Sequence, residues 1–257
     1  MNYLRKIYPL WLREWLYFHL IFRRKSWPED LDEVSLEFAP AQMGSYLDSD
    51  LIHRQIAWTG FYELELSRRM ADLARKGGLL VDVGANVGYF TLMWAALNHQ
   101  NKVYAFEPSP RNFAMLQNNI SILPNATGIK IFDHAVGKES GLFHFDIGPK
   151  EQSGWGGLSK SAAESTIQTQ VRRLDDIIPA DTLISVLKID TEGADTWVLM
   201  GAENLLRQKR IKNIFFESNP DRMRQLEIQP EDSERFLNGL NYTISRLGDT
   251  EYYATPK

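Results

Sequence analysis

The sequence predicts an α/β fold built around a mainly parallel β-sheet, and two observations support this. From residue 79 onward, short apolar runs of strand length alternate with helix-like segments, the order that produces parallel sheets. The first run, residues 79–83, leads directly into a turn with two glycines, Gly84 and Gly88. With 257 residues, of which 44% are hydrophobic, the chain can bury one large core, so global disorder is excluded.

The first half of this region predicts three strands and two helices. The strands are expected over 79–83, 102–106 and 129–136, and the helices over 86–98 and 110–123. Pro110 suits the first turn of the second helix, where the missing N–H has no partner to lose. Because a helix follows each of the first two strands, we expect the strands to run parallel.

The second half adds further strands and helices. Strands are expected over 183–189 and 213–216, with helices over 194–207 and 230–240. Two last strands over 242–247 and 251–254 flank Gly248-Asp249. This turn sequence predicts a C-terminal antiparallel hairpin.

A segment of different character interrupts the alternation. Residues 141–147 alternate apolar and polar side chains, which predicts a β excursion. Residues 148–166 are rich in glycine and serine and predict a flexible loop that could act as a lid. Trp155 in this loop could stack on the apolar face of a sugar when the loop closes, or it could anchor the loop to the core.

Charge and composition exclude several functions. The formal net charge of −4 and the pI near 5.8 argue against nucleic-acid binding through phosphates. The chain has no cysteine, which excludes disulfides and thiolate metal sites. A reducing cytoplasm is the simplest location for such a chain.

The glycine turn, residues 84–88, is the first candidate site. Ligands of doubly wound sheets bind beyond the carboxyl ends of the strands, where the strand order reverses. Gly84 and Gly88 would let a cofactor approach the backbone there, and Asp82 could orient loop amides. Glu107 follows Gly84 by 23 residues. That is near the spacing of about 20 expected for a carboxylate that accepts hydrogen bonds from a ribose.

Position 86 discriminates between two cofactors. Dinucleotide-binding turns follow the pattern G-x-G-x-x-G, in which the open helix N-terminus receives a pyrophosphate. This chain has Asn86 where that pattern requires its second glycine. A cofactor without phosphates does not need this opening, so the sequence favours S-adenosylmethionine. An NAD-dependent oxidoreductase is the alternative enzyme.

Five segments form a combination that is more specific than any one of them. In order, they are Val81–Phe90, Phe106-Glu107-Pro108, Ala135-Val136-Gly137, Leu174-Asp175-Asp176 and Lys188–Ala194. In this combination the chain resembles the FkbM-type S-adenosylmethionine-dependent methyltransferases over about residues 79–220. The resemblance implies a Rossmann-like, doubly wound sheet. It also implies O-methylation of a hydroxyl on a sugar, glycolipid or polyketide-type product.

The resemblance also implies roles for individual residues. The methionine end of the cofactor would be lined by Asp82, Gly84, Asn86 and Gly88. Glu107 would hold the ribose, and Asp133 would lie beside the adenine amino group. An alternative role for Asp133 is to cap the turn that follows its strand.

Asp190 and Glu192 follow the strand at 183–189 and are the candidate catalytic residues. Methyl transfer to a sugar hydroxyl requires an aligned acceptor and removal of its proton. Lys188 lies on the same face as Asp190 in an extended strand, where a cation could lower the carboxylate pKa or stabilise a developing alkoxide. The alternative is a structural Lys–Asp pair that caps the next helix.

A metal is a further option at these strand ends. Asp190, Glu217 and Asn219 could supply the oxygen ligands that Mg²⁺ prefers. Acids at neighbouring strand ends also bind substrate hydroxyls, so Mg²⁺ is an option and no metal residue is assigned. The expected acceptor is a small molecule, a sugar or a lipid-linked glycan.

Residues 1–60 are expected to form an N-terminal helical arm beside a methyltransferase domain over 61–257. Residues 1–27 carry six basic side chains and one acidic. Apolar residues recur there at helical spacing, namely Leu4, Tyr8, Trp11, Trp15, Phe18 and Phe22. Pro9 is expected to mark the start of the helix.

This stripe admits two interpretations. A basic, aromatic helix can lie on an anionic membrane, which would place a cytoplasmic protein at the inner face of a membrane through residues 1–27. Leu12, Leu16 and Leu20 lie off the stripe and favour packing on a partner or on the chain itself. No signal peptide or spanning helix is expected. A non-catalytic, membrane-associated binding module is a third functional hypothesis, disfavoured by the intact acidic residues.

Overall fold

The computed structural model describes residues 3–24, 33–124 and 126–257. Lys25 and Trp27 of the predicted arm lie outside these ranges. Within them, a seven-stranded sheet has the order β12-β13-β11-β10-β3-β4-β5. The strands are β3 (Leu79–Val83), β4 (Lys102–Phe106), β5 (Ile129–Phe132), β10 (Val186–Ile189), β11 (Ile214–Glu217), β12 (Tyr242–Arg246) and β13 (Glu251–Pro256).

The strand order confirms the doubly wound sheet. Strands β11, β10, β3, β4 and β5 pair in parallel. The chain builds outward from β3 to β5 and then returns to β10 on the other side of β3, so the order reverses between β3 and β10. Strand β13 is antiparallel to β11 and to β12, which confirms the C-terminal hairpin.

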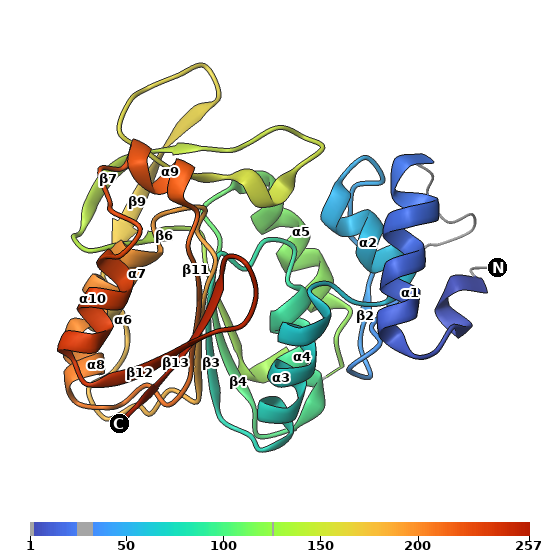
Figure 1. The fold of residues 1–257 in the computed structure, drawn as a ribbon, viewed down its shortest axis with the longest axis horizontal. Helices are drawn as coiled ribbons and strands as arrows, with labels where there is room; N and C mark the ends of the chain where they lie inside the picture. The colour runs from blue at the N-terminus through green and yellow to red at the C-terminus, as the bar shows by residue number, and fades with distance from the viewer. Residues whose placement is uncertain (1–2, 25–32, 125) are drawn as a thin grey trace.

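Helices cover both faces of this sheet (Figure 1). One face carries α3 (Leu64–Arg75), α4 (Tyr89–Leu97) and α5 (Pro110–Ser121), with α1 (Leu10–Leu16) and α2 (Leu51–Thr59) farther out. The other face carries α6 (Leu174–Ile177), α7 (Asp195–Gly201), α8 (Glu203–Arg207) and α10 (Asp232–Gly239). A short helix, α9 (Pro220–Gln225), follows β11.

The buried character of β3 explains this layering. All five of its residues are buried, as expected for a strand with helices on both faces. Leu80 packs into the core beneath α3 and α4, whereas Leu79 and Val81 pack into the core beneath α7 and α8. Alternate side chains of β3 therefore pack into two separate cores, one on each face of the sheet.

Several boundaries differ from those predicted. The strand expected over 129–136 divides into β5 and β6 (Ala135–Val136), which belongs to a second sheet. The helix expected over 194–207 divides at Ala202 into α7 and α8. The helix expected from residue 86 begins only at Tyr89, because the backbone of Asn86 is left-handed with φ +50°.

The second sheet has four strands among the described residues, in the order β6-β9-β7-β8. It contains β7 (Gly141–Asp146), β8 (Gly157–Ser159) and β9 (Thr166–Arg172). Strand β7 confirms the predicted β excursion. The expected loop is shorter than 148–166, because β8 pairs antiparallel with β7 within that range. We call the connection between them, residues 147–156, the Trp155 loop.

The N-terminal region shares a core with the rest of the chain. Helix α1 begins directly after Pro9, as predicted. Short strands β1 (Val34–Ser35) and β2 (Gln42–Met43) pair antiparallel. Val34 and Ile56 pack in the same buried cluster as Leu80 of the central sheet. The hydrophobic core thus continues across residue 60.

The aromatic stripe of the arm is divided between core and solvent. Leu4 is buried, whereas Trp11 is 59% exposed, Trp15 49% and Phe18 41%. Lys6 and Arg23 are exposed as well. Contact of these basic and aromatic side chains with a membrane stays a prediction. In the described part of the chain, no helix combines the length and apolar character needed to span a bilayer.

Candidate active site

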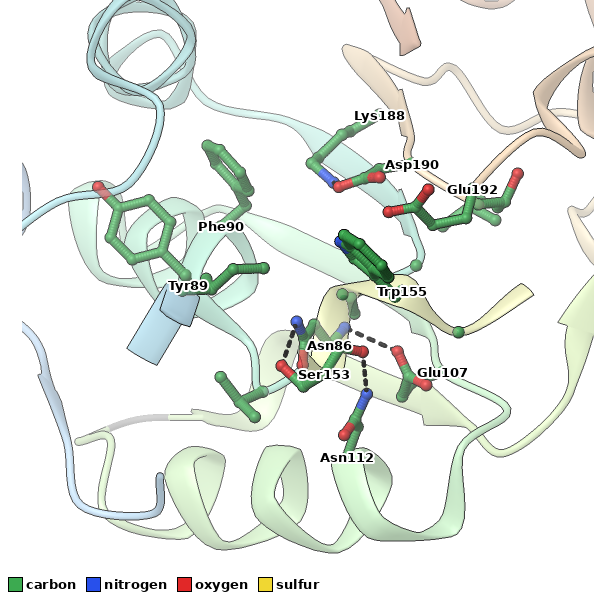
Figure 2. A pocket seen from close by; sticks show the side chains of 18 of the residues that line it. Asn86, Tyr89, Phe90, Glu107, Asn112, Ser153, Trp155, Lys188, Asp190 and Glu192 are labelled. Atoms are coloured by element: carbon green, nitrogen blue, oxygen red, sulfur yellow. Dashed lines mark hydrogen bonds and ion pairs between the residues drawn. The ribbon is translucent and has the colours of Figure 1, made fainter. Parts of the chain in front are cut away.

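A cavity of about 370 Å³ lies at the carboxyl ends of β3, β4 and β10. This is where the strand order reverses, and therefore where ligands of doubly wound sheets bind. Its walls come from the glycine turn, the Trp155 loop, the end of β10 and helix α2 (Figure 2).

The glycine turn and the end of β4 form one hydrogen-bonded unit. The carboxylate of Glu107 accepts hydrogen bonds from the backbone N–H of Asn86 at 2.8 Å and of Ser109 at 2.9 Å. Glu107 is only 4% exposed yet lines the cavity. Burial raises the pKa of Glu107 to about 7, although these two donors oppose the rise. A carboxylate held in this way is positioned to accept further hydrogen bonds from a ligand hydroxyl.

The two glycines serve the packing of the chain itself. A side chain on Gly84 would collide with the backbone of Asp190. A side chain on Gly88 would collide with Leu116 of α5, and Gly88 does not line the cavity. Both have left-handed backbone, at φ +80° and +97°. The sequence located the turn, but the reason for its glycines is contact between strands and helices.

Asp82 lies beneath the cavity and does not line it. It is 1% exposed and accepts a hydrogen bond from Thr91 Oγ1 at 2.7 Å. Its Oδ1 has no hydrogen-bond partner and lies 4.0 Å from Lys188 Nζ. Burial raises the pKa of Asp82, and the positive charge of Lys188 opposes this. Asp82 therefore contacts Lys188 beneath the cavity without lining the cavity itself.

Lys188 points from β10 toward the cavity and pairs with Asp190. The distance from Lys188 Nζ to Asp190 Oδ2 is 3.2 Å, as the extended strand predicts. Burial lowers the pKa of Lys188, but Asp190, Asp82 and Glu63 raise it by more, to above its ordinary range. Lys188 consequently stays protonated and is excluded as a proton acceptor at neutral pH.

Carboxylates gather around this lysine. Besides Asp190, Glu192 and Glu217, two glutamates that the sequence did not indicate line the cavity, Glu63 before α3 and Glu251 at the start of β13. We call these five residues the acidic cluster. Glu217 and Glu251 are direct cross-strand neighbours on β11 and β13. Like charges at such positions are destabilising, so this arrangement lowers stability unless protons or a ligand offset it.

The surroundings raise the pKa of several members of this cluster. Burial, followed by the negative charge of Asp190, raises the pKa of Glu192 to about 7 and that of Glu217 to about 8. Burial and Asp190 likewise raise the pKa of Glu63 to about 7. Carboxyl groups with such values can exchange protons near neutral pH, as general acid–base chemistry requires.

Two of the residues considered for Mg²⁺, Asp190 and Asn219, have other polar partners. Asn219 Nδ2 donates to Glu192 Oε2 at 2.9 Å, and Asn219 Oδ1 accepts from the backbone of Arg222 at the start of α9. Across the described ranges, no group of three or more histidine or acidic side chains is arranged to hold a metal ion.

Asp133 lies away from this cavity. Strand β5 ends at Phe132, and the chain then turns toward β6. Asp133 is exposed and lines a separate hollow with Pro110 and Arg172. The structure thus does not bring Asp133 to the other predicted cofactor residues.

The Trp155 loop lies over the cavity and is held by polar contacts (Figure 2). Asn86 Nδ2 donates to Ser153 Oγ at 3.1 Å, and Asn112 Nδ2 donates to the Ser153 carbonyl at 3.1 Å. The carbonyl of Trp155 accepts a hydrogen bond from Arg222 at 2.8 Å. The Trp155 ring is 52% exposed, so it is not anchored in the core.

The cavity has groups that fit S-adenosylmethionine. Asn86 Oδ1 is a buried acceptor without a hydrogen-bond partner, which suits the ammonium group of an amino-acid moiety. Glu107 suits the ribose hydroxyls, and the apolar side chains of Phe106 and Val136 line the same cavity. When bound, this cofactor supplies an electrophilic methyl group.

The reversed strand order, the buried carboxylate after β4 and the non-glycine position 86 define the class of S-adenosylmethionine-dependent methyltransferases. Residues 82–244 match the family model described as "Methyltransferase FkbM domain". This is more than half of the chain, and the chain belongs to the FkbM methyltransferase family. The assignment confirms methyl transfer and disfavours both the NAD-dependent oxidoreductase and the non-catalytic module.

Named relatives agree with this assignment. "Methyltransferase 1" of Beauveria bassiana is 28% identical over 197 residues, with 67% of this chain and 74% of the relative covered. The "31-O-demethyl-FK506 methyltransferase FkbM" of Streptomyces tacrolimicus is 30% identical over 162 residues, with 51% and 61% covered. The "Hexuronic acid methyltransferase AglP" of Haloferax volcanii is 23% identical over 193 residues, with 74% of each chain covered.

Proposed function

We propose that this protein transfers a methyl group to a hydroxyl oxygen of a carbohydrate, a glycolipid or a related natural product. The observation that carries the proposal is the Lys188–Asp190 pair at 3.2 Å inside an acidic wall of the cavity. Strand β10 lies beside β3 on the side away from β4. The acidic cluster therefore lines the same cavity as Glu107 and Asn86, the residues that suit the cofactor.

The proposed division of roles follows from this geometry. Glu107 and Asn86 bind the cofactor, and the acidic cluster binds the acceptor hydroxyls. As the acceptor oxygen bonds to the methyl carbon, the carbon–sulfur bond breaks and its electrons stay on sulfur. Asp190 takes the hydroxyl proton, and the fixed positive charge of Lys188 orients Asp190 for this step. Glu192, whose pKa is raised to about 7 by burial and by Asp190, is the alternative acceptor of this proton.

The relatives support the acceptor class. One relative is named a 31-O-demethyl-FK506 methyltransferase, and another is named a hexuronic acid methyltransferase. Carboxyl groups that line a cavity suit polyhydroxyl acceptors because each can bind hydroxyl hydrogens.

The test combines binding and product analysis. Titration calorimetry should show S-adenosylhomocysteine binding to the wild-type protein and at least about tenfold weaker binding to Glu107→Gln, because the charged hydrogen-bond acceptor is lost. Radiolabelled S-adenosylmethionine should label glycan, glycolipid or natural-product extracts. Mass analysis should then place the methyl group on oxygen. Failure of the wild-type protein to bind S-adenosylhomocysteine, or methylation only at nitrogen or carbon, would overturn the proposal.

A further inference from the structure

Helix α2 contributes to the cavity although it precedes the family match at residue 82. Leu51, Ile52 and Ile56 of this helix line the cavity. Asp50 begins the helix, and its Oδ1 accepts hydrogen bonds from the backbone N–H of Ile52 at 2.9 Å and of His53 at 3.0 Å. This capping fixes the orientation of the first turn of α2.

The same first turn holds the Trp155 loop. The second carboxylate oxygen of Asp50 accepts a short hydrogen bond from the backbone N–H of Ser153. The backbone N–H of Leu51 donates to the carbonyl of Glu151 at 3.1 Å. Asp50 is fully buried, and Ser153 is 2% exposed. These contacts join two segments that are 100 residues apart in the sequence.

His53 completes the connection. Its Nδ1 accepts a hydrogen bond from the backbone N–H of Leu47 at 2.9 Å, which leaves the ring hydrogen on Nε2. Nε2 lies 3.3 Å from Ser153 Oγ and can therefore donate to it. Burial lowers the pKa of His53, which keeps the ring neutral, as this arrangement requires.

Ser153 then links α2 to the glycine turn. Its hydroxyl oxygen accepts a hydrogen bond from Asn86 Nδ2 at 3.1 Å and can accept another from His53 Nε2. Asn86 in turn bonds Glu107 through its backbone N–H. A continuous polar chain thus runs from the capped end of α2 through the Trp155 loop to the proposed ribose-binding carboxylate.

We propose that His53 is a positioning residue of the cofactor site, which sets the Trp155 loop and the Asn86 carboxamide through Ser153. This inference rests on the proposed placement of the cofactor against Asn86 and Glu107. The N-terminal segment is then part of the binding machinery. A site that is preorganised in this way does not spend binding free energy on ordering its loop.

The test compares three variants in binding and in hydrogen exchange. His53→Leu and Ser153→Ala should each weaken S-adenosylhomocysteine binding about tenfold and speed amide exchange in residues 147–156. His53→Gln should bind within about threefold of wild type, because its amide nitrogen can replace Nε2 as the donor to Ser153. Ser161→Ala, at an exposed serine after β8, is the matched control and should bind as wild type does.

A double variant separates a shared network from independent effects. If both side chains act through one hydrogen bond, His53→Leu/Ser153→Ala should be little weaker than either single variant. If Ser153→Ala binds S-adenosylhomocysteine with wild-type affinity and its residues 147–156 exchange at the wild-type rate, the positioning role is overturned. The proposed function is then left intact. Equal weakening in His53→Gln and His53→Leu would also overturn the positioning role, because the donor would then be irrelevant. Loss of binding by the wild type itself would instead count against the proposed function.

Discussion

The backbone of Gly84 lies directly against the main-chain carbonyl of Asp190. A Cβ built on Gly84 would stand 1.9 Å from that oxygen, far inside van der Waals contact. The turn proposed to bind the cofactor and the residue proposed to accept the proton are therefore fixed relative to each other by backbone contact. This fixed relation favours in-line transfer, which depends on accurate alignment of the reacting groups.

Gly84→Ala should disturb both halves of the site. The left-handed backbone and the absence of space together predict a loss of roughly 2 kcal/mol or more in the free energy of unfolding. Binding of S-adenosylhomocysteine should weaken as well, because Asp190 and the turn must move apart. Urea unfolding and calorimetry measure the two effects. Gly239→Ala is the control, since nothing lies within 4 Å of its added Cβ; equal stability of the two variants would disprove the packing argument.

Asp190→Asn should separate binding from chemistry. The amide keeps the size of the side chain but cannot accept the acceptor's proton in the same way, so kcat should fall about 10²- to 10⁴-fold. Affinity for S-adenosylhomocysteine should stay within a few-fold of wild type. Glu192→Gln is the comparison variant, and it should retain more activity. If Glu192→Gln were the more severe change, the role of proton acceptor would pass to Glu192.

Lys188→Met should leave Asp82 and Asp190 without their shared cation. Removing one partner of a buried ion pair costs about 3–5 kcal/mol, so we expect destabilisation of about 3 kcal/mol at pH 8. The difference from wild type should shrink as the pH falls, because burial raises the pKa of Asp82 and its protonation removes an unpaired buried charge. Unfolding at pH 5 and at pH 8 measures this. Lys212→Met, at an exposed lysine, should show no such pH dependence.

The ligand-free protein should lose stability as the pH rises from about 5 to about 8. Burial and neighbouring acids raise the pKa of Glu107 and of Glu192 to about 7 and that of Glu217 to about 8, from an ordinary value of 4.5. Across this interval the folded protein binds more protons than the unfolded chain, so raising the pH favours unfolding. By linkage, a carboxyl group with a pKa of about 7 in the folded protein contributes on the order of 3 kcal/mol to this loss, so the total should be several kcal/mol.

The same titration can be assigned to a residue. Glu217→Gln removes the group with the highest of these pKa values, so its stability curve should be flatter between pH 7 and pH 8. Chemical unfolding at four pH values would show this. A wild-type curve that rises across the interval would contradict the assignment of raised pKa values.

The predictable part of the site is the part that is local in sequence. The apolar run of β3 leads directly into the glycine turn, and Glu107 and Asp190 directly follow the strands on either side of β3. Such residues meet because parallel strands end at one edge of a sheet. Lys188 and Asp190 are two residues apart on one strand, so their pairing follows from strand geometry alone.

The remaining part depends on contacts that no local pattern encodes. Glu63 lines the cavity from the position just before α3, where its backbone is left-handed at φ +44°. Glu251 reaches it through the register of β13 against β11. Asp133 follows a strand at the outer edge of the sheet, where the chain turns away into the second sheet. The partner of His53 in the polar network, Ser153, lies 100 residues later in the sequence.

Helix α2 lines the pocket but lies outside the region that matches the family model. The ends of β3, β4, β10 and β11 fall within residues 82–244, the region that matches the family model, whereas one wall of the pocket is built by residues 51–56, upstream of that region. Exchanging Leu51, Ile52 and Ile56 while keeping Asp50 and His53 would reshape the pocket and leave the strand ends that carry Glu107 and Asp190 unchanged. Engineered chimaeras of this kind offer a direct route to altered acceptor choice, and natural divergence could follow the same route.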